Sequence, residues 1–243
     1  YFLDLEDTEE AALEAEVDEL VNWHRVQMLP HYTSFLRQIA NHVEAGPIGE
    51  TFVRRTTDDF RKLMRKTVEG AAPFIGDVLF DHTTPSKLAH LGTRMKERLQ
   101  EHRAALEEPQ ADRINTKEEK AILWFERLFG NFTPAQTTLT RVYFENAEKM
   151  TTVFLDAREK RWQAFLTFLS QNPTSDEIKQ FLPIIILQSE LVIGHQYKQI
   201  SQMWWTQYSN WIVEISVSLS LQQRQHFSRV LRSYATDMIE LSN

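Results

Sequence analysis

The helix openings Thr133-Pro134-Ala135-Gln136 and Ser220-Leu221-Gln222-Gln223 share the pattern Ser/Thr-x-x-Gln, and a long helical pattern follows each of them. In such a capping box, the first hydroxyl accepts a hydrogen bond from a backbone N–H of the new helix, and the glutamine reaches back to the capping residue. Proline suits the first helical position, because a backbone N–H there has no partner within the helix. The two openings therefore predict a chain made of successive capped helices.

Three further openings follow the same rule less closely. Thr84-Pro85-Ser86-Lys87 has lysine in the last position, while Thr116-x-x-Glu119 and Thr174-x-x-Glu177 have glutamate. The apolar residues after the caps do not fall in one phase, so only the openings match and not whole units. We interpret the recurrence as a common way of starting a helix, with an ancestral repeat of helical hairpins as the alternative.

Apolar residues recur at helical spacing along nearly the whole chain, and no stretch shows sustained alternation. The sequence therefore predicts an all-α fold, a multi-helix bundle of about seven to nine helices, several of them long and kinked at proline. We expect a first helix from near Asp7 with a kink at Pro30, a helix over 50–69, a short one over 74–80, and later helices after Thr84, Thr116, Thr133, Thr174 and Ser220.

Two boundaries decide the expected domain organisation. The polar stretch 107–116 contains Pro109 and is the best candidate for a linker. We predict one all-α domain over residues 1–243, which this linker can divide into halves 1–106 and 117–243. Towards the C-terminus, the helix that opens after Thr174 is expected to continue past a kink at Pro183 to about Ser218.

The composition argues against several kinds of chemistry. There is no cysteine, so disulfides, thiolate nucleophiles and cysteine metal sites are excluded for this sequence. The 8 histidines are scattered, and neither bundle metal motifs nor phosphate-binding or nucleophile-elbow motifs occur. We therefore predict no metal site, no cofactor and no enzymatic activity. The net charge of −7 argues against nucleic acid as a partner, and the most apolar run, 181–187, is too short to cross a membrane.

Residue types that often serve binding sites gather near the first helix. Trp23, His24 and Arg25 are followed closely by Pro30 and Tyr32. One interpretation is structural, with Trp23 and Tyr32 packing, His24 at a helix contact and Arg25 paired with an acid. The other is a binding site, in which the kink at Pro30 exposes His24 and Arg25 to an anionic group. A cryptic enzyme centred on His24 is a third hypothesis.

A second candidate surface is aromatic. Tyr197, Trp204, Tyr208 and Trp211 form one helical stripe, which favours packing in a core. Trp205 lies about 100° from Trp204 around the helix, so we expect one of the two to be exposed to a partner or an apolar ligand.

A third candidate surface is basic. Residues 54–66 carry six cations against two acids. We expect this face to be solvated or paired with the acidic first helix, because residues 1–20 carry nine acids and no base, and binding of anionic lipid heads or nucleic acid is the alternative.

One family resemblance rests on the N-terminal part of the chain. The block Tyr1-Phe2-Leu3-Asp4-Leu5-Glu6-Asp7, then Trp23-His24-Arg25, then Leu29-Pro30-x-Tyr32-x-x-Phe35-Leu36, resembles bacterial envelope lipoproteins known as the domain of unknown function 6279. The resemblance extends through 132–136 to the terminal helix 220–241. It implies a periplasmic helical domain tethered to the outer membrane by a lipidated cysteine upstream of Tyr1. The absence of cysteine and of an initial methionine is consistent with this, and the family implies no activity.

A looser resemblance concerns the helix openings. Phe132-Thr133-Pro134-Ala135-Gln136 and Leu219-Ser220-Leu221-Gln222-Gln223 look like the Leu-Thr-x-x-Gln motif of Spy/CpxP-type periplasmic helical chaperones and stress sensors. Only the second opening keeps the leucine, and serine replaces threonine there. Because the motif is largely a capping box, convergence also explains the likeness.

These features predict a non-enzymatic periplasmic lipoprotein domain that acts through protein–protein interaction, with a chaperone-like action as the sharper form. The expected partner is an envelope protein or an unfolded client, and the expected contact with the membrane is the upstream lipid anchor alone. The alternative is a carrier that holds a lipid or acyl chain between helices, lined by residues 181–187 and 204–211.

Overall fold

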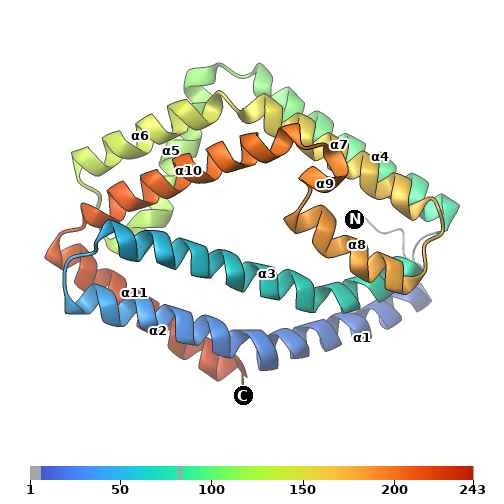
Figure 1. Ribbon diagram of the computed structural model, residues 1–243, viewed down its shortest axis with the longest axis horizontal. Helices are drawn as coiled ribbons and strands as arrows, with labels where there is room; N and C mark the ends of the chain where they lie inside the picture. The colour runs from blue at the N-terminus through green and yellow to red at the C-terminus, as the bar shows by residue number, and fades with distance from the viewer. Residues whose placement is uncertain (1–6, 82–83, 243) are drawn as a thin grey trace. The chain divides into compact units, whose positions relative to one another are not determined.

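The computed structural model describes residues 7–81 and 84–242, with side chains from residue 13 onward, and these residues are helical without any strand. Most of the Tyr1–Asp7 block of the family resemblance lies outside the described residues. The α-helices are α1 (Asp7–Trp23), α2 (Leu29–Ala45), α3 (Glu50–Asp81), α4 (Pro85–Ala104), α5 (Gln110–Phe129), α6 (Pro134–Glu148), α7 (Thr151–Leu169), α8 (Ser175–Leu187), α9 (Glu190–Ile193), α10 (Gln196–Val217) and α11 (Leu221–Ser242) (Figure 1). The predicted all-α class is confirmed.

The described residues form more helices than the seven to nine predicted. The expected long helix from Thr174 to Ser218 is wrong, because three helices, α8, α9 and α10, occupy that stretch. Gln188 leaves the helical conformation with φ −135°, and Gly194 takes φ +109°, a value that favours glycine. Pro183, in contrast, lies inside α8 without ending it.

A predicted break is also absent from α3. The helix continues through Pro73 to Asp81, where a separate short helix over 74–80 was expected. A proline inside a helix removes one backbone hydrogen bond, and packing can offset that loss. Ala72, directly before the proline, is buried in a hydrophobic core, which supplies such packing.

The predicted linker 107–116 is mostly helix. α5 begins at Gln110, so Thr116 lies within the helix and does not cap it. The carbonyl oxygen of Pro109 accepts hydrogen bonds from the backbone N–H groups of Asp112 and Arg113 at 3.0 and 3.2 Å. The polarity of this stretch therefore reflects a solvated first turn of a helix rather than a flexible connection.

The predicted disturbance at Pro30 takes the form of a π-helical segment, His24–Met28, directly before α2. A π turn shifts the hydrogen-bond register by one residue. Pro30, which has no N–H to donate, lies directly after this segment in the first turn of α2.

The described helices form two compact units, each assembled from three stretches of chain. The first unit takes its described residues from Tyr1–His24, Met64–Glu107 and Thr151–Ile200, and its core contains Ala72, Leu91, Leu169, Ile178 and Leu182. The second takes them from Arg25–Leu63, Glu108–Met150 and Ser201–Asn243, and its core contains Val43, Phe125, Phe129, Trp211 and Ile215 among others. Neither unit coincides with the halves 1–106 and 117–243.

Within the second unit, α2 packs along α11 (Figure 1, blue and red). Ala40 on α2 and Ala235 on α11 are fully buried, and such small side chains let two helices approach closely. The Ser228 hydroxyl donates to the carbonyl oxygen of Ala40 at 3.3 Å. Arg232 Nη2 adds a bond to Asn41 Oδ1 at 2.8 Å, so polar contacts flank the apolar seam.

Both Ser/Thr-x-x-Gln openings form capping boxes within this second unit. At the start of α6, the Thr133 N–H donates to Gln136 Oε1 at 2.9 Å and the Gln136 N–H donates to Thr133 Oγ1 at 3.3 Å. At the start of α11, the corresponding bonds between Ser220 and Gln223 measure 3.0 and 3.2 Å.

The two glutamine side chains of these boxes bind each other. Gln136 Nε2 donates to Gln223 Oε1 at 3.2 Å, and Gln223 Nε2 donates to Gln136 Oε1 at 2.9 Å. Their second N–H groups reach Ser218 Oγ at 3.0 Å and the Asn131 carbonyl oxygen at 2.9 Å. Both glutamines are buried, and all donors and acceptors of both amides are satisfied. The junction therefore joins the starts of α6 and α11.

We expect strong coupling between these glutamines. Gln136→Met or Gln223→Met alone leaves the other amide buried with unmade hydrogen bonds, and each should lower the free energy of unfolding by about 1–3 kcal/mol. The double variant should cost clearly less than the sum, because no amide is then stranded. Denaturant unfolding of the four proteins measures this coupling.

The capping box of α8 supplies the control, because the Glu177 side chain that closes it is exposed and bonds only within the box. Glu177→Met should cost about 1 kcal/mol or less. Strict additivity of the two glutamine variants would contradict the mutual role of their amides.

Candidate functional site

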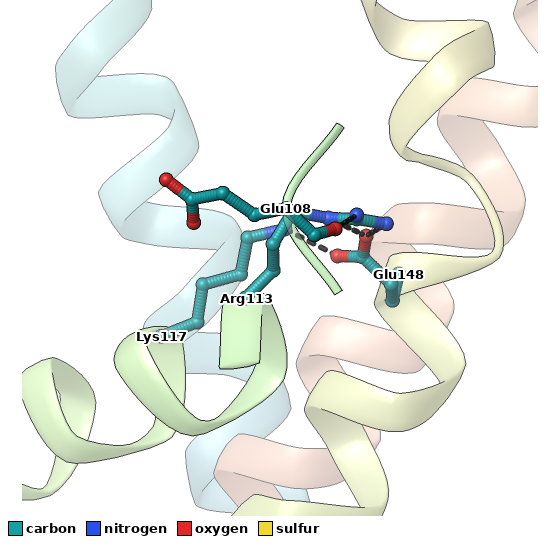
Figure 2. A network of polar contacts seen from close by, with 4 residues as sticks. All are labelled: Glu108, Arg113, Lys117 and Glu148. Carbon is teal, nitrogen blue, oxygen red and sulfur yellow. Dashed lines mark hydrogen bonds and ion pairs between the residues drawn. The ribbon is translucent and has the colours of Figure 1, made fainter. Parts of the chain in front are cut away.

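Glu148, at the end of α6, is a buried carboxylate held by two cations of α5 (Figure 2). Its Oε1 accepts from Arg113 Nε at 2.8 Å and from Nη2 at 2.6 Å, and its Oε2 accepts from Lys117 Nζ at 2.5 Å. The Glu148 side chain is only 2% exposed. Arg113 also donates through Nη1 to the backbone carbonyl oxygen of Glu108, which anchors the start of α5.

The environment of Glu148 favours its charged form. Burial by itself raises the pKa of this carboxyl, but the hydrogen bonds and charges of Lys117 and Arg113 outweigh it and lower the pKa below the ordinary value. The group is therefore ionised at neutral pH, with both oxygens occupied. This arrangement positions helices and offers no proton donor for catalysis.

A second ion network joins the same two helices, but here the cation lies on α6 and the acid on α5. Arg141 on α6 binds Glu118 on α5 at 2.9 Å and its own neighbour Glu145 at 3.0 Å, and it also donates to Asn115. Cations of α5 thus bind an acid of α6, while a cation of α6 binds an acid of α5. The rotation of α5 about its axis is fixed by these contacts together with its buried Phe125 and Phe129.

The fixed rotation of α5 leaves two large apolar side chains in solvent. Leu123 is 61% exposed and Trp124 is 55% exposed, although Trp124 stands next to the buried Phe125 with their rings in an edge contact. On a helix, Lys120 and Arg127 lie three or four residues from both, and both cations are exposed. Glu119 and Glu126 also lie three or four residues from Leu123, so charges of both signs flank Leu123, while Trp124 is flanked by the two cations.

The cluster predicted near the first helix is used for packing. Trp23 is half-buried in the first unit, with its ring 5.8 Å from that of Phe74. It also lies against Gly70, where a Cβ would come within 2.1 Å of Trp23 Cζ2. His24 is half-buried beside it, with the two ring centroids 6.4 Å apart. Packing thus accounts for the tryptophan.

The remaining members of that cluster belong to the second unit. Arg25 is exposed, and its Nε donates to the carbonyl oxygen of Leu241 at 2.6 Å. It therefore caps the end of α11 where pairing with an acid was expected. Pro30 is exposed and Tyr32 is half-buried.

The aromatic stripe of α10 packs mainly inward. Trp211 is buried, and its ring stacks on Tyr143 at 4.1 Å, so it does not contribute to a surface. Trp204 and Trp205 are both half-buried and meet edge to face at 4.9 Å, and the Arg61 guanidinium lies 4.7 Å over Trp205. Burial raises the pKa of the Tyr143 phenol to about 12, which matches a packed, apolar setting.

The basic face 54–66 is largely engaged. Arg54 binds Glu50 at 2.7 Å, Lys62 binds Asp59 at 2.9 Å, and Arg65 lies 3.6 Å from Glu69. These exposed pairs are weak. The acids of these three pairs lie on α3 itself and not on the acidic first helix.

The described residues contain neither a cluster of metal ligands nor a membrane-spanning helix. No group of three or more His, Asp or Glu side chains there is placed to hold a metal ion. None of the helices in residues 7–81 and 84–242 is both long and apolar enough to span a bilayer.

Sequence reasoning missed Glu148, Leu123 and Trp124. Glu148 lies 31 and 35 residues from its cations, so no local spacing reveals the pairing. The apolar pair has a signal in principle, because Leu123 and Trp124 fall outside the helical stripe formed by Ile114, Phe125 and their buried neighbours. That signal becomes visible only once α5 is known to start at Gln110.

Comparison with known proteins identifies the family. The model of a family described as "Family of unknown function (DUF6279)" matches residues 1–198, so the chain belongs to this family. The second Ser/Thr-x-x-Gln opening lies beyond the matched residues. No curated protein and no solved structure matches the chain.

The ion network around Glu148 leads to a pH-dependent prediction. Glu148→Gln should lower the free energy of unfolding by about 2 kcal/mol at neutral pH, because it leaves two cations without their carboxylate. A lowered pKa in the folded state contributes stability above the ordinary pKa, and this is lost as pH falls through the lowered value. The difference from wild type should therefore be constant near neutrality and shrink in acid.

Denaturant unfolding across this pH range measures the effect. Glu145→Gln is the matched control, since Glu145 is an exposed partner within α6 and should cost about 0.5 kcal/mol or less. A Glu148→Gln effect that stays unchanged in acid would contradict an ionised Glu148.

Proposed function

We propose that this member of the DUF6279 family is a non-enzymatic, protein-binding domain of the bacterial cell envelope, and that α5 carries its docking surface. The observation that carries the proposal is the exposed pair Leu123 and Trp124 on a helix held by buried ion pairs. Tryptophan is the residue type most enriched among binding hot spots. A rigid helix also loses little conformational freedom when a partner binds.

The charges around the pair indicate the chemistry of the partner. Lys120 and Arg127 are the charged residues that flank Trp124 along the helix, so a matching segment presents acidic residues next to the apolar side chain that contacts Trp124. An unfolded or extended segment of an envelope protein offers this chemistry, because its apolar side chains are accessible. This is the chaperone-like form of the proposal.

Binding of defined peptides tests the docking surface. An acidic, apolar peptide should bind the chain, and the double variant Leu123→Ser/Trp124→Ser should weaken that binding by about tenfold or more. A basic peptide with the same apolar residues should bind more weakly, because Lys120 and Arg127 repel it. Fluorescence anisotropy of labelled peptides measures both differences.

The control is Val142→Ser, which removes an exposed apolar side chain from α6 at a site that the proposal does not use. It should leave peptide affinity unchanged, and the double variant should also fail to suppress aggregation of an unfolded client that wild type protects. Equal binding by wild type and the double variant would exclude α5 as the docking surface.

The proposal includes a periplasmic location with attachment to the outer membrane by a lipid. Its support is the resemblance of the N-terminal block to envelope lipoproteins. Growth of cells with radiolabelled palmitate should label the full-length protein, and the label should disappear when a cysteine upstream of Tyr1 is replaced by serine. Fractionation should then find the variant soluble in the periplasm. Absence of label from the unaltered protein would refute the lipid anchor.

A further inference from the structure

An open groove of about 340 Å³ lies between α2 and α11 within the second unit. Its polar wall comes from one stretch of α2, with Thr33, Ser34, Arg37, Gln38 and Asn41. Pro30 and Ile239 add apolar surface, and none of the described residues that line the groove carries a carboxylate. The wall is therefore positively charged and rich in hydrogen-bonding groups.

The hydrogen bonds already made by this wall leave donors for a ligand. Asn41 uses Oδ1 to accept from Arg232 Nη2 at 2.8 Å, so its NH₂ group points to other partners. Ser34 uses Oγ to accept from Gln38 Nε2 at 3.3 Å, which keeps its own O–H available to donate. Ser34 and Asn41 therefore offer hydrogen-bond donors to a ligand in the groove, because their side-chain oxygens already accept hydrogen bonds.

Two further groups of the wall have no hydrogen-bond partner within the described part of the chain. Thr33 is 6% exposed, and its buried Oγ1 makes no hydrogen bond within the described part of the chain. Arg37 has neither an ion pair nor a hydrogen bond among residues 13–81 and 84–242. A buried hydroxyl without a partner is unusual in a folded protein. Because this Oγ1 has almost no accessible surface, a ligand in the groove reaches it only after a shift of the Thr33 side chain.

We propose that this groove binds a phosphate group, either free or as part of a phosphorylated headgroup. A guanidinium binds phosphate oxygens through two parallel N–H bonds, and the hydroxyl and amide donors of Thr33, Ser34 and Asn41 suit the remaining oxygens. The absence of a lining carboxylate removes the repulsion that would oppose an anion. The apolar surface of Pro30 and Ile239 accommodates the carbon atoms of an organic phosphate.

The groove shares Pro30 with the anion site that was one interpretation of the sequence, but its other residues differ. Pro30 lines it as expected, whereas Arg25 bonds to the end of α11 and His24 belongs to the other unit. Arg37, seven residues beyond Pro30 and two turns along α2, supplies the charge instead.

Titration of the purified chain with inorganic phosphate and with glycerol 3-phosphate tests the proposal, with acetate as the comparison anion. Phosphate should bind more tightly than acetate. Arg37→Gln should raise the Kd for phosphate by about tenfold or more, which is the expected loss of a charge-assisted contact. Arg229→Gln is the matched control, because Arg229 is an exposed arginine of α11 outside the groove, and it should leave the Kd unchanged.

Thr33→Val separates binding from stability. The variant should raise the Kd for phosphate by about fivefold, since one donor is lost. It should not lower the melting temperature of the ligand-free protein, because it removes a buried hydroxyl that has no partner. A lower melting temperature together with unchanged phosphate binding would show a purely structural Thr33 and would count against the site.

Vesicles distinguish the source of the phosphate. Binding to phosphatidylglycerol vesicles that exceeds binding to phosphatidylcholine vesicles and depends on Arg37 assigns the site to an anionic lipid headgroup. Binding of glycerol 3-phosphate without such vesicle binding assigns it to a soluble phosphate. Equal losses in Arg37→Gln and Arg229→Gln, or no phosphate binding at millimolar concentration, would overturn the proposal.

Discussion

The mutual hydrogen bonds of Gln136 and Gln223 are the constraint on which the second unit depends. A buried primary amide is costly unless all its donors and acceptors are satisfied. Each glutamine meets this demand with bonds to its own capping residue and to the other glutamine. The start of each helix and the contact between the helices are therefore satisfied by the same side chains, and neither can change without the other.

The glutamine junction holds the start of α6, and a second buried polar group holds its end. The helix is fixed at its start by Gln136 and at its end by Glu148, both buried polar groups with long-range partners. Because Glu148 binds cations of α5, the position of α6 also decides the rotation of α5. Leu123 and Trp124 are exposed as a consequence of these buried contacts and not because α5 is loosely attached. A docking surface made in this way is rigid, which limits the entropy lost on binding.

Local features of the sequence predict much of this fold, while its long-range features do not follow from local rules. The caps at Thr84, Thr133, Thr174 and Ser220 all form, because a cap involves only neighbouring residues. The helix boundaries at Gln110 and Gln188 were missed, since tertiary contacts and single backbone torsions decide them. The partnership of Gln136 and Gln223, 87 residues apart, required the structure.

The candidate surface residues differ from those predicted for a similar reason. Burying a large apolar side chain contributes about 1.5–3 kcal/mol, so a tryptophan in a helical stripe usually faces the core. Trp211 follows this rule, and Trp23 packs on Phe74. Choosing candidate surface residues by their type alone therefore selected positions that are packed. The position of a residue around the helix, relative to the buried face, is a better criterion for choosing surface residues than its residue type. Trp124 departs from the stripe that contains Phe125, and an apolar side chain kept out of phase on a well-anchored helix is the support for the docking surface that we propose.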